Sequence, residues 1–463
     1  MYRWKHVSLV LVLAMALALV SACAPKAAPT AVPPTAKPPT AVPPTAVPPT
    51  PVPPAPIVLT VWNWEYKTLD EYNDKQFAIF EQQNPGVTVV RSIFPAVGEG
   101  GYEQKLLTSL ATGTGPDIFF VTDGAAATYA SKKLVLSLED SGLKAMGFAS
   151  MDELYKTLGY LPAGLNGWRV GGKTYGLPNE VSWLALFVNK DCMTDSGIDP
   201  ATVKLDTWDD LIAVANKMSR FDDKGNFTRE GHDLPTYLDD TWNMLVVNMF
   251  MVQSGGQIVS PDGTESWINR PEAINGFKEM LKIVRNGKSG SPDFGSPGIG
   301  GMVTDWIAGV NTCMLISVPV IPTLVKFPVV SYAIPKMASG GPGDTMFGWA
   351  WQVNAASKHP DLAWKLMRQM CSDAESHCRE AGFLFPIANL MESPCVKANP
   401  GAPGLQASLE KSNPQFIFSS PVYPEITSIV RKAYELCAFE GADVQATMDN
   451  AAREINEALK SGG

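Results

Sequence analysis

The sequence predicts an α/β fold, and three observations along the chain support this prediction. First, predicted strands and helices alternate from residue 57 onward, which is the pattern of a parallel sheet with crossover helices. Second, Val181–Val188 is an almost uncharged run rich in Val, Leu, Phe and Trp, which is typical of a strand buried on both faces. Third, 45% of the 463 residues are hydrophobic and 18% are charged, which allows a sizeable core in two or three domains.

The chain begins with a predicted export signal. Within residues 1–22, two basic side chains precede an apolar run over 7–20 that is too short to serve as a stable membrane span. The following residues, VSAC at positions 20–23, resemble a bacterial lipobox, which implies cleavage before Cys23 and attachment of lipid to it. We expect a lipid anchor on the outer face of the cytoplasmic membrane, with plain secretion as the alternative.

Residues 23–56 are predicted to form a linker that starts at the lipidated cysteine. The tract from 24 to 56 contains 14 prolines and only two charged residues. Because proline lacks a backbone donor, such a tract favours polyproline II over helix or sheet. At about 3.1 Å per residue it reaches roughly 100 Å, so we expect a stalk between the membrane and the rest of the chain. Threonine beside proline also admits O-glycosylation.

The charge of the chain excludes two kinds of partner. Removal of the signal takes two cations away and changes the formal net charge from −9 to −11. No basic stripe is present, so we expect no nucleic-acid partner. An acidic surface also does not adhere to anionic lipid, so the acyl chains would provide the membrane attachment.

The first half of the folded part carries candidate ligand-binding residues at strand ends. Predicted strands 57–62, 87–93 and 118–121 alternate with predicted helices 70–83 and 102–111. Open α/β sheets bind ligands at the carboxyl ends of their strands, which is where Trp62, Trp64, Glu65 and Asp123 occur. Glu180 and Trp183 lie at the start of the buried run, where a carboxylate is costly to place for stability alone.

Several motifs, taken in order, carry a resemblance to a known family. They are FEQQNPGVTVV (80–90), LATGTGPDIFFVTDG (110–124), KTYGLPNEVSWLALFVNKD (173–191), TWDDL (207–211) and SKHPDLAW (357–364). Together they resemble the extracellular solute-binding proteins of sugar ABC importers, the family that includes maltose-binding protein. The resemblance covers nearly all of residues 57–463.

This resemblance implies a periplasmic-binding-protein-like fold, in which two α/β lobes are joined by a hinge and hold the ligand in a cleft between them. Carried over by motif, the crossings between the lobes fall near 180–183, 329–335 and 370–373. The implied division assigns 57–180 plus 334–371 to lobe 1, and 181–333 plus 372–463 to lobe 2.

A sugar cleft needs flat aromatic platforms and planar hydrogen-bond acceptors. Asp240 and Trp242 precede an apolar helix, and Trp349 and Trp351 alternate onto one face of a strand in a segment that borders the cleft in the family. The complete predicted set is Trp62, Trp64, Glu65, Asp123, Glu180, Trp183, Asp240, Trp242, Trp349 and Trp351. Core packing is the alternative for each, and it is the expectation for Trp168, Trp208 and Trp364.

Six cysteines follow Cys23, at positions 192, 313, 371, 378, 395 and 437. An even number outside the cytoplasm favours disulfides, although free buried cysteines remain the alternative and the pairing stays open. If one straight helix holds Cys371 and Cys378, they lie too far apart to bond. No Cys or His spacing fits a metal, and the acidic loop at 222–225 lacks the glutamate that closes a calcium site. We expect no metal and no cofactor.

The function predicted from these features is transport-linked binding without catalysis. No GxSxG, HExxH or P-loop motif occurs. We expect a monomer that binds a mono- or oligosaccharide between two lobes and delivers it to the transmembrane subunits of an ABC permease. The alternatives are the same fold with a non-sugar solute (glycerol phosphate, polyamine or metal), a surface glycoside hydrolase that uses paired carboxylates, and a structural wall protein.

Overall fold

The computed structural model describes residues 56–95, 102–234, 236, 240–286 and 312–462. The predicted signal, the lipidation site Cys23 and the linker up to residue 55 lie outside these residues.

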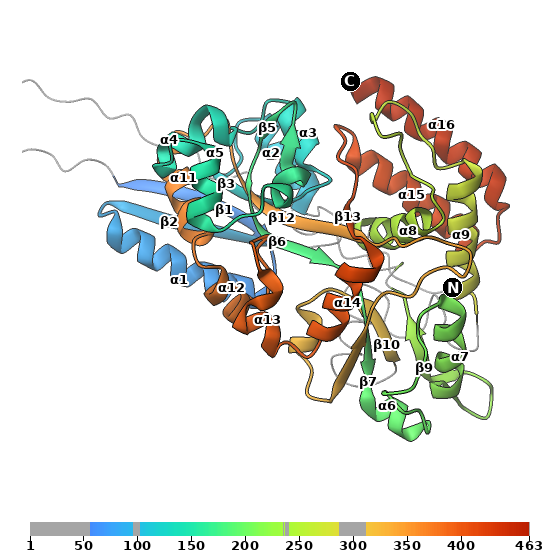
Figure 1. Ribbon diagram of the computed structural model, residues 1–463. Helices are drawn as coiled ribbons and strands as arrows, with labels where there is room; N and C mark the ends of the chain where they lie inside the picture. Colours follow the sequence, from blue (N-terminus) through green and yellow to red (C-terminus); the bar gives the residue numbers. More distant parts are fainter. Residues whose placement is uncertain (1–55, 96–101, 235, 237–239, 287–311, 463) are drawn as a thin grey trace, which may run out of the picture. The chain divides into compact units, whose positions relative to one another are not determined.

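The first sheet confirms the predicted parallel arrangement of the N-terminal strands. β1 (Ile57–Trp64) pairs in parallel with β2 (Val87–Phe94) and β3 (Ile118–Thr122). β12 (Thr345–Val353) continues the sheet antiparallel to β3 and also pairs with β6 (Leu177–Trp183). The short β13 (Gln415–Phe416) completes the order β13-β12-β3-β1-β2, which can be followed by its labels in Figure 1.

Helices and short turns cover this sheet. α1 (Lys67–Gln83) starts three residues before the predicted helix and ends as predicted, at a turn whose Gly86 has a φ of +91°. Buried residues of α1, β1 and α11 (Pro360–Met370) share one core that contains Trp351 and Trp364. The remaining elements are α2 (Tyr102–Ala111), α3 (Ala126–Ser131), η1 (Leu138–Gly142), α4 (Leu143–Met146), α5 (Met151–Leu158), η2 (Pro162–Trp168), β4 (Arg169–Val170), β5 (Lys173–Thr174) and α12 (Ala374–Ala381).

The second sheet has the order β11-β7-β10-β9-β8. Its strands are β7 (Ala185–Asn189), β8 (Arg220–Phe221), β9 (Phe227–Asp233), β10 (Thr312–Ser317) and β11 (Val329–Tyr332). Helices packed around it or linking it to the first sheet are α6 (Lys190–Asp195), α7 (Trp208–Met218), α8 (Asp240–Gln253), α9 (Pro271–Val284), η3 (Ile321–Thr323), η4 (Leu390–Glu392), α13 (Pro394–Ala398), α14 (Ala402–Ser412), α15 (Tyr423–Ala438) and α16 (Val444–Gly462).

The buried run Val181–Val188 differs from its prediction as a single strand. The structure divides it at Leu184, so that β6 belongs to the first sheet and β7 to the second. The backbone N–H of Leu184 donates to the buried carboxylate of Asp344, 3.2 Å away. Uniform apolar composition predicts burial but does not show where a strand leaves one sheet for another.

The buried side-chain amide of Gln253, in α8, hydrogen-bonds to Trp208 and to the segment between β11 and β12. Its Oε1 accepts from Trp208 Nε1 (2.8 Å) and from the N–H of Met337 (3.1 Å). Its Nε2 donates to the carbonyls of Pro335 (2.9 Å) and Gly343 (3.0 Å). All four hydrogen-bonding positions of the amide are therefore used.

The C-terminal segments contact both sheets, whereas the predicted division places all of 372–463 in lobe 2. α12 packs on α1 of the first sheet, with an ion pair of 2.7 Å between Lys75 and Glu380. β13 hydrogen-bonds to β12 in that sheet. By contrast, α14 packs on β11 of the second sheet, and α15 packs on α8.

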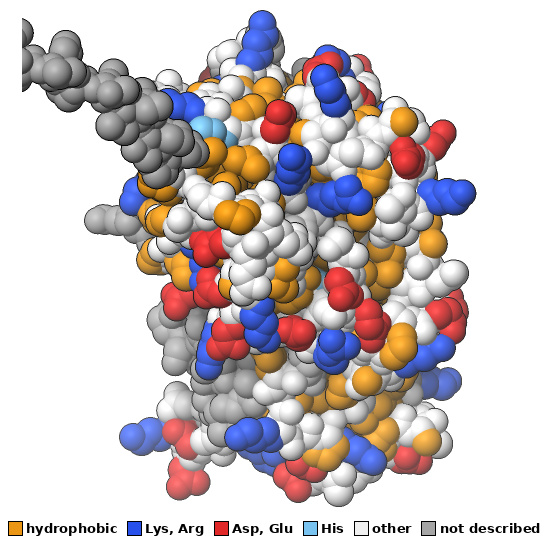
Figure 2. All heavy atoms as spheres, turned by 90° about the vertical axis from the view of Figure 1, so that its left-hand side faces the viewer, with side chains coloured by type: hydrophobic (Ala, Val, Ile, Leu, Met, Phe, Trp, Pro, Cys, Tyr) orange, Lys and Arg blue, Asp and Glu red, His pale blue; other side chains and the backbone are white. Residues whose placement is uncertain are grey.

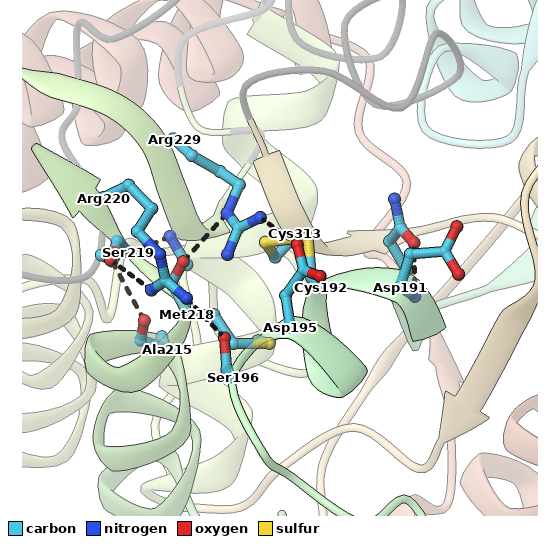
Figure 3. The surroundings of a disulfide bond; sticks show 12 residues. Asp191, Cys192, Asp195, Ser196, Ala215, Met218, Ser219, Arg220, Arg229 and Cys313 are labelled. Carbon is cyan, nitrogen blue, oxygen red and sulfur yellow. Dashed lines mark hydrogen bonds and ion pairs between the residues drawn. A yellow bond between two sulfur atoms is a disulfide. The ribbon is translucent and has the colours of Figure 1, made fainter.

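Two disulfides occur among the described residues, Cys192–Cys313 and Cys378–Cys395, and Cys371 and Cys437 are buried free thiols. Figure 3 shows the first disulfide, which joins α6 to β10 beside an ion pair of 3.3 Å between Asp195 and Arg229. Cys371 and Cys378 are not bonded to each other.

Within the described ranges, no helix combines the length and apolar composition that a membrane span requires. On the face of the molecule shown in Figure 2, basic and acidic side chains are interspersed and do not gather by sign.

Candidate functional site

The candidate site is built around strand β12, which lies between β3 and β6. Trp349 of β12 is paired with Thr122 on one side and with Glu180 on the other. Residues paired across strands project from the same face of a sheet, so Glu180 and Trp349 are neighbours on one face. The pairing of β12 with β6 shifts register just after Trp349, and such irregularities redirect side chains locally.

Two half-buried tryptophans from different strands pack against each other at this place, with their rings tilted by 57°. The ring centroids of Trp64, at the end of β1, and Trp349 lie 3.9 Å apart. Phe120 of β3 supports both rings, at 4.5 Å from Trp64 and 5.8 Å from Trp349. The sheet therefore holds a rigid aromatic pair that remains partly exposed.

Glu180 provides a buried carboxyl group beside this pair. Its side chain is 3% exposed, and Ser182 Oγ donates to its Oε1 at 2.6 Å. Its Oε2 has no hydrogen-bond partner among the described residues. Burial raises the pKa of Glu180 to about 8. A buried oxygen without a partner carries a desolvation cost that a ligand hydroxyl group would remove.

Asp123, which follows β3, approaches β12 from the side opposite to β6, next to Gly348. The N–H of Asp123 donates to the Gly348 carbonyl (3.1 Å), and the N–H of Gly348 donates to Asp123 Oδ1 (3.4 Å). Asp123 Oδ2 has no partner in the part of the chain that the structure describes. Burial raises the pKa of Asp123 to about 7. Both buried carboxyl groups thus meet the same dipeptide of β12.

Glycine is required at position 348 because the chain packs closely there. A Cβ atom on Gly348 would lie 2.4 Å from the carbonyl oxygen of Glu180 and 2.7 Å from the Trp168 ring. Contacts this short are not tolerated, so any side chain would displace β6 from β12. The glycine therefore sets the position of Glu180 relative to Trp349.

The structure gives four other predicted residues the following surroundings. Glu65 is exposed immediately after Trp64. Trp62 is half-buried, with its ring 4.7 Å from Phe94. Trp242, near the start of α8, meets the ring of Phe347 edge-on at 6.3 Å, which brings a helix of the second sheet to β12. Asp240 accepts a hydrogen bond from Ser428 (3.1 Å).

Trp183 and Trp351 are placed differently from the other predicted aromatic residues. Trp183 is 1% exposed, and its Nε1 donates to the Leu405 carbonyl at 3.0 Å. Trp351 is fully buried, with its ring 4.6 Å from Phe120. Neither ring offers surface to a ligand in this conformation, so the structure favours the packing alternative for both. Trp168, Trp208 and Trp364 are buried as expected.

The structure adds Tyr66, Ser182 and Phe383 to the site. The Tyr66 ring lies 4.8 Å from Phe383, and burial together with the nearby Glu180 carboxylate raises the pKa of Tyr66. Asp70 accepts the backbone N–H of Tyr66 at 3.1 Å and so holds this residue at the start of α1. Tyr66 follows the predicted Trp64 and Glu65 directly in sequence, so their prediction could have been extended to it. Phe383 has no local signal because only the tertiary structure brings it here.

Taken together, the site presents a partly exposed aromatic pair and two buried carboxyl groups, each with one unpaired oxygen. Aromatic faces pack on the apolar faces of sugar rings, while carboxyl oxygens accept hydrogen bonds from hydroxyl groups. No group of three or more His, Cys, Asp and Glu side chains in the described ranges is placed to hold a metal ion.

Comparison with known proteins gives consistent similarities. A family profile described as bacterial extracellular solute-binding protein matches residues 63–375. The galactooligosaccharide-binding protein of Bacillus subtilis is 24% identical over 358 residues, which cover 75% of this chain and 78% of that protein.

Solved structures share the fold. An ABC substrate-binding protein from Listeria monocytogenes, in complex with cycloalternan, superposes with a TM-score of 0.73 at 20% identity and covers 87% of this chain and 99% of that chain. The maltose/maltodextrin-binding domain from Bdellovibrio bacteriovorus, bound to maltotriose, has a TM-score of 0.72 at 17% identity and covers 87% and 100% of the two chains.

Proposed function

The chain belongs to the bacterial extracellular solute-binding protein family, and we propose that it is the carbohydrate receptor of an ABC importer. In this role it binds a mono- or oligosaccharide outside the cytoplasm and delivers it to the transmembrane subunits of a permease. The fold is that of periplasmic solute-binding proteins, and relatives and structural neighbours are named for oligosaccharides.

The observation that carries the proposal is the aromatic pair Trp64–Trp349, whose tilted rings pack against each other beside the unpaired oxygen of Glu180. A sugar ring packed on the exposed part of the pair would place hydroxyl groups within reach of buried acceptors. The gain is large because each hydroxyl group would pair with a buried carboxyl oxygen that has no hydrogen-bond partner among the described residues. Glu65, Asp123, Asp240, Trp62 and Trp242 are proposed as the surrounding contacts.

We propose that the two sheets with their helices are the two lobes and that the ligand binds between them. Leu184, where β6 passes into β7, then marks one crossing, and α12 and β13 belong with the first lobe. A ligand that contacts both lobes shifts the population toward the closed form. Binding alone accomplishes this, so the proposal includes no covalent step and no cofactor.

The proposal also includes the membrane attachment predicted from the sequence. A lipid on Cys23 would hold a monomeric receptor at the outer face of the cytoplasmic membrane, and the proline-rich linker would set its reach. Mass spectrometry of the protein extracted from membranes tests this: a diacylglyceryl modification at Cys23 is expected, and an unmodified Cys23 would contradict it.

A thermal-shift screen of the full-length protein tests the function. The probes are maltotriose, mannobiose, a galactooligosaccharide mixture, glycerol 3-phosphate and putrescine, each followed by chromatography of the recovered compound. A ligand at a hundredfold excess over its Kd stabilises the native state by about 2.7 kcal/mol. We expect a shift with a sugar that is recovered intact. A shift only with the phosphate or the amine, or cleavage of the sugar, would contradict the proposal.

A further inference from the structure

The Cys378–Cys395 disulfide closes a loop that runs beside the candidate site. The bond joins α12 to α13 and encloses a segment of the chain with a sequence separation of 17. Phe383 and Leu384 lie within this loop and are buried, at 6% and 2% exposure. The loop is therefore both covalently closed and packed into the protein.

The loop contacts the site at two places. The carbonyl of Leu384 accepts the N–H of Val181 at 2.6 Å, directly after Glu180 in β6. The ring of Phe383 packs on Tyr66 at 4.8 Å, and Tyr66 lies close enough to Glu180 for that carboxylate to influence it. β6 thus has β12 on one side and the disulfide-closed loop on the other, with Glu180 between them.

The same stretch of chain links the two sheets. Within the loop, the Ala381 carbonyl accepts a hydrogen bond from Thr68 of α1 at 2.8 Å. After α13, Asn399 Nδ2 donates to the Pro319 carbonyl at 2.7 Å, at the end of the second sheet's β10 region. A change in the loop would therefore alter both the surroundings of Glu180 and a connection between the sheets.

We propose that the Cys378–Cys395 disulfide is a positioning element of the binding site, which holds Phe383 and Leu384 against Tyr66 and β6 before the ligand arrives. This inference rests on the proposed function for its effect on affinity. Without the bond, the free protein samples loop conformations in which β6 loses its outer partner. Binding must then order the loop, and that ordering opposes binding. Ordering of one residue's backbone is enough to weaken binding about tenfold, which corresponds to about 1.4 kcal/mol.

The chain offers a matched control in its other disulfide. Cys192–Cys313 joins α6 to β10, and none of its neighbours labelled in Figure 3 belongs to the candidate site. The double variants C378A/C395A and C192A/C313A each remove one bond from the full-length protein. A purely stabilising role predicts that each variant lowers the Tm and leaves the Kd of the folded protein unchanged.

Two measurements test the proposal. Calorimetric titration with maltotriose and mannobiose is expected to give a Kd about tenfold higher for C378A/C395A and unchanged for C192A/C313A. Hydrogen exchange of the ligand-free protein is expected to be at least about tenfold faster at the Val181 amide in C378A/C395A alone. The proposal would be overturned if C378A/C395A has the same Kd as the unmodified protein, or if the Kd and the exchange rate change equally in the two variants.

The exchange measurement separates this inference from the proposed function. If neither sugar binds the unmodified protein, the proposed function loses its support. The positioning role is then tested by hydrogen exchange at the Val181 amide alone. Unchanged exchange at Val181 in C378A/C395A then overturns the inference, and faster exchange supports it.

Discussion

Replacement of Glu180 by Gln tests whether the site holds a buried carboxyl group in its neutral form. Burial raises the pKa of Glu180 from 4.5 to about 8, although Ser182 Oγ donates a hydrogen bond to its Oε1. Between these two pH values the folded protein keeps a proton that the unfolded chain releases. The free energy of unfolding therefore falls as pH rises from about 4.5 to about 8. At about 1.4 kcal/mol per pH unit, the interval corresponds to about 5 kcal/mol.

The variant Glu180→Gln has nearly the same shape but does not titrate. We expect its stability relative to the unmodified protein to rise by about 1.4 kcal/mol per pH unit between pH 6 and 8, and to level off above that range. Asp123, whose pKa is raised to about 7, also lowers the stability as pH rises. This loss occurs to the same extent in both proteins and therefore cancels in the difference.

Urea denaturation followed by tryptophan fluorescence, at pH values from 5 to 9, measures this difference directly. Glu65→Gln is the matched control, because it makes the same chemical change at an exposed side chain of the same site. If the unmodified protein and Glu180→Gln lose stability in parallel over the whole range, the argument from burial fails.

Three further predictions concern packing, buried hydrogen bonds and the aromatic pair. Gly348→Ala places a Cβ atom 2.4 Å from the Glu180 carbonyl and should cost about 1–3 kcal/mol by calorimetry, whereas Gly341→Ala, which meets no atom within 4 Å, should leave the Tm unchanged. Gln253→Ala leaves four buried partners unpaired and should lower the free energy of unfolding in urea by about 3 kcal/mol or more; a loss below about 1 kcal/mol would show that water replaces the amide. Trp349→Ala removes half of the aromatic pair and should raise the Kd for the bound sugar about tenfold in titration calorimetry. An unchanged Kd with an intact fold would remove Trp349 from the site.

Local patterns predicted much of the first sheet. The alternation of strands and helices indicated that β1, β2 and β3 are parallel, and the Asn84-Pro85-Gly86 turn indicated the end of α1. Thr207 was predictable as the N-cap of α7, where its hydroxyl accepts the N–H of Asp210. These features depend on a few neighbouring residues, whose hydrogen bonding and spacing are the same in any tertiary context.

The candidate site was predictable in part for the same reason. Trp64 and Glu65 follow a strand that the local pattern identifies, and Glu180 is an unexpected charge at the start of a buried run. Trp183 and Trp351 have the same sequence signal as Trp64 and yet are buried. The sequence shows that an aromatic residue lies on a strand, but not which elements cover that face of the strand.

The sequence by itself determined the α/β class and the parallel arrangement of the N-terminal strands, and it supplied the candidate residues for a site. Only the tertiary structure decided that β12 lies between β3 and β6, that the run 181–188 divides at Leu184, and that Phe383 reaches Tyr66. It also decided which cysteines pair. Helices, caps and turns are set by interactions within a few residues, whereas strand neighbours and disulfides join residues far apart in sequence. Which of those distant residues meet depends on the packing of the whole core, and no local pattern records it.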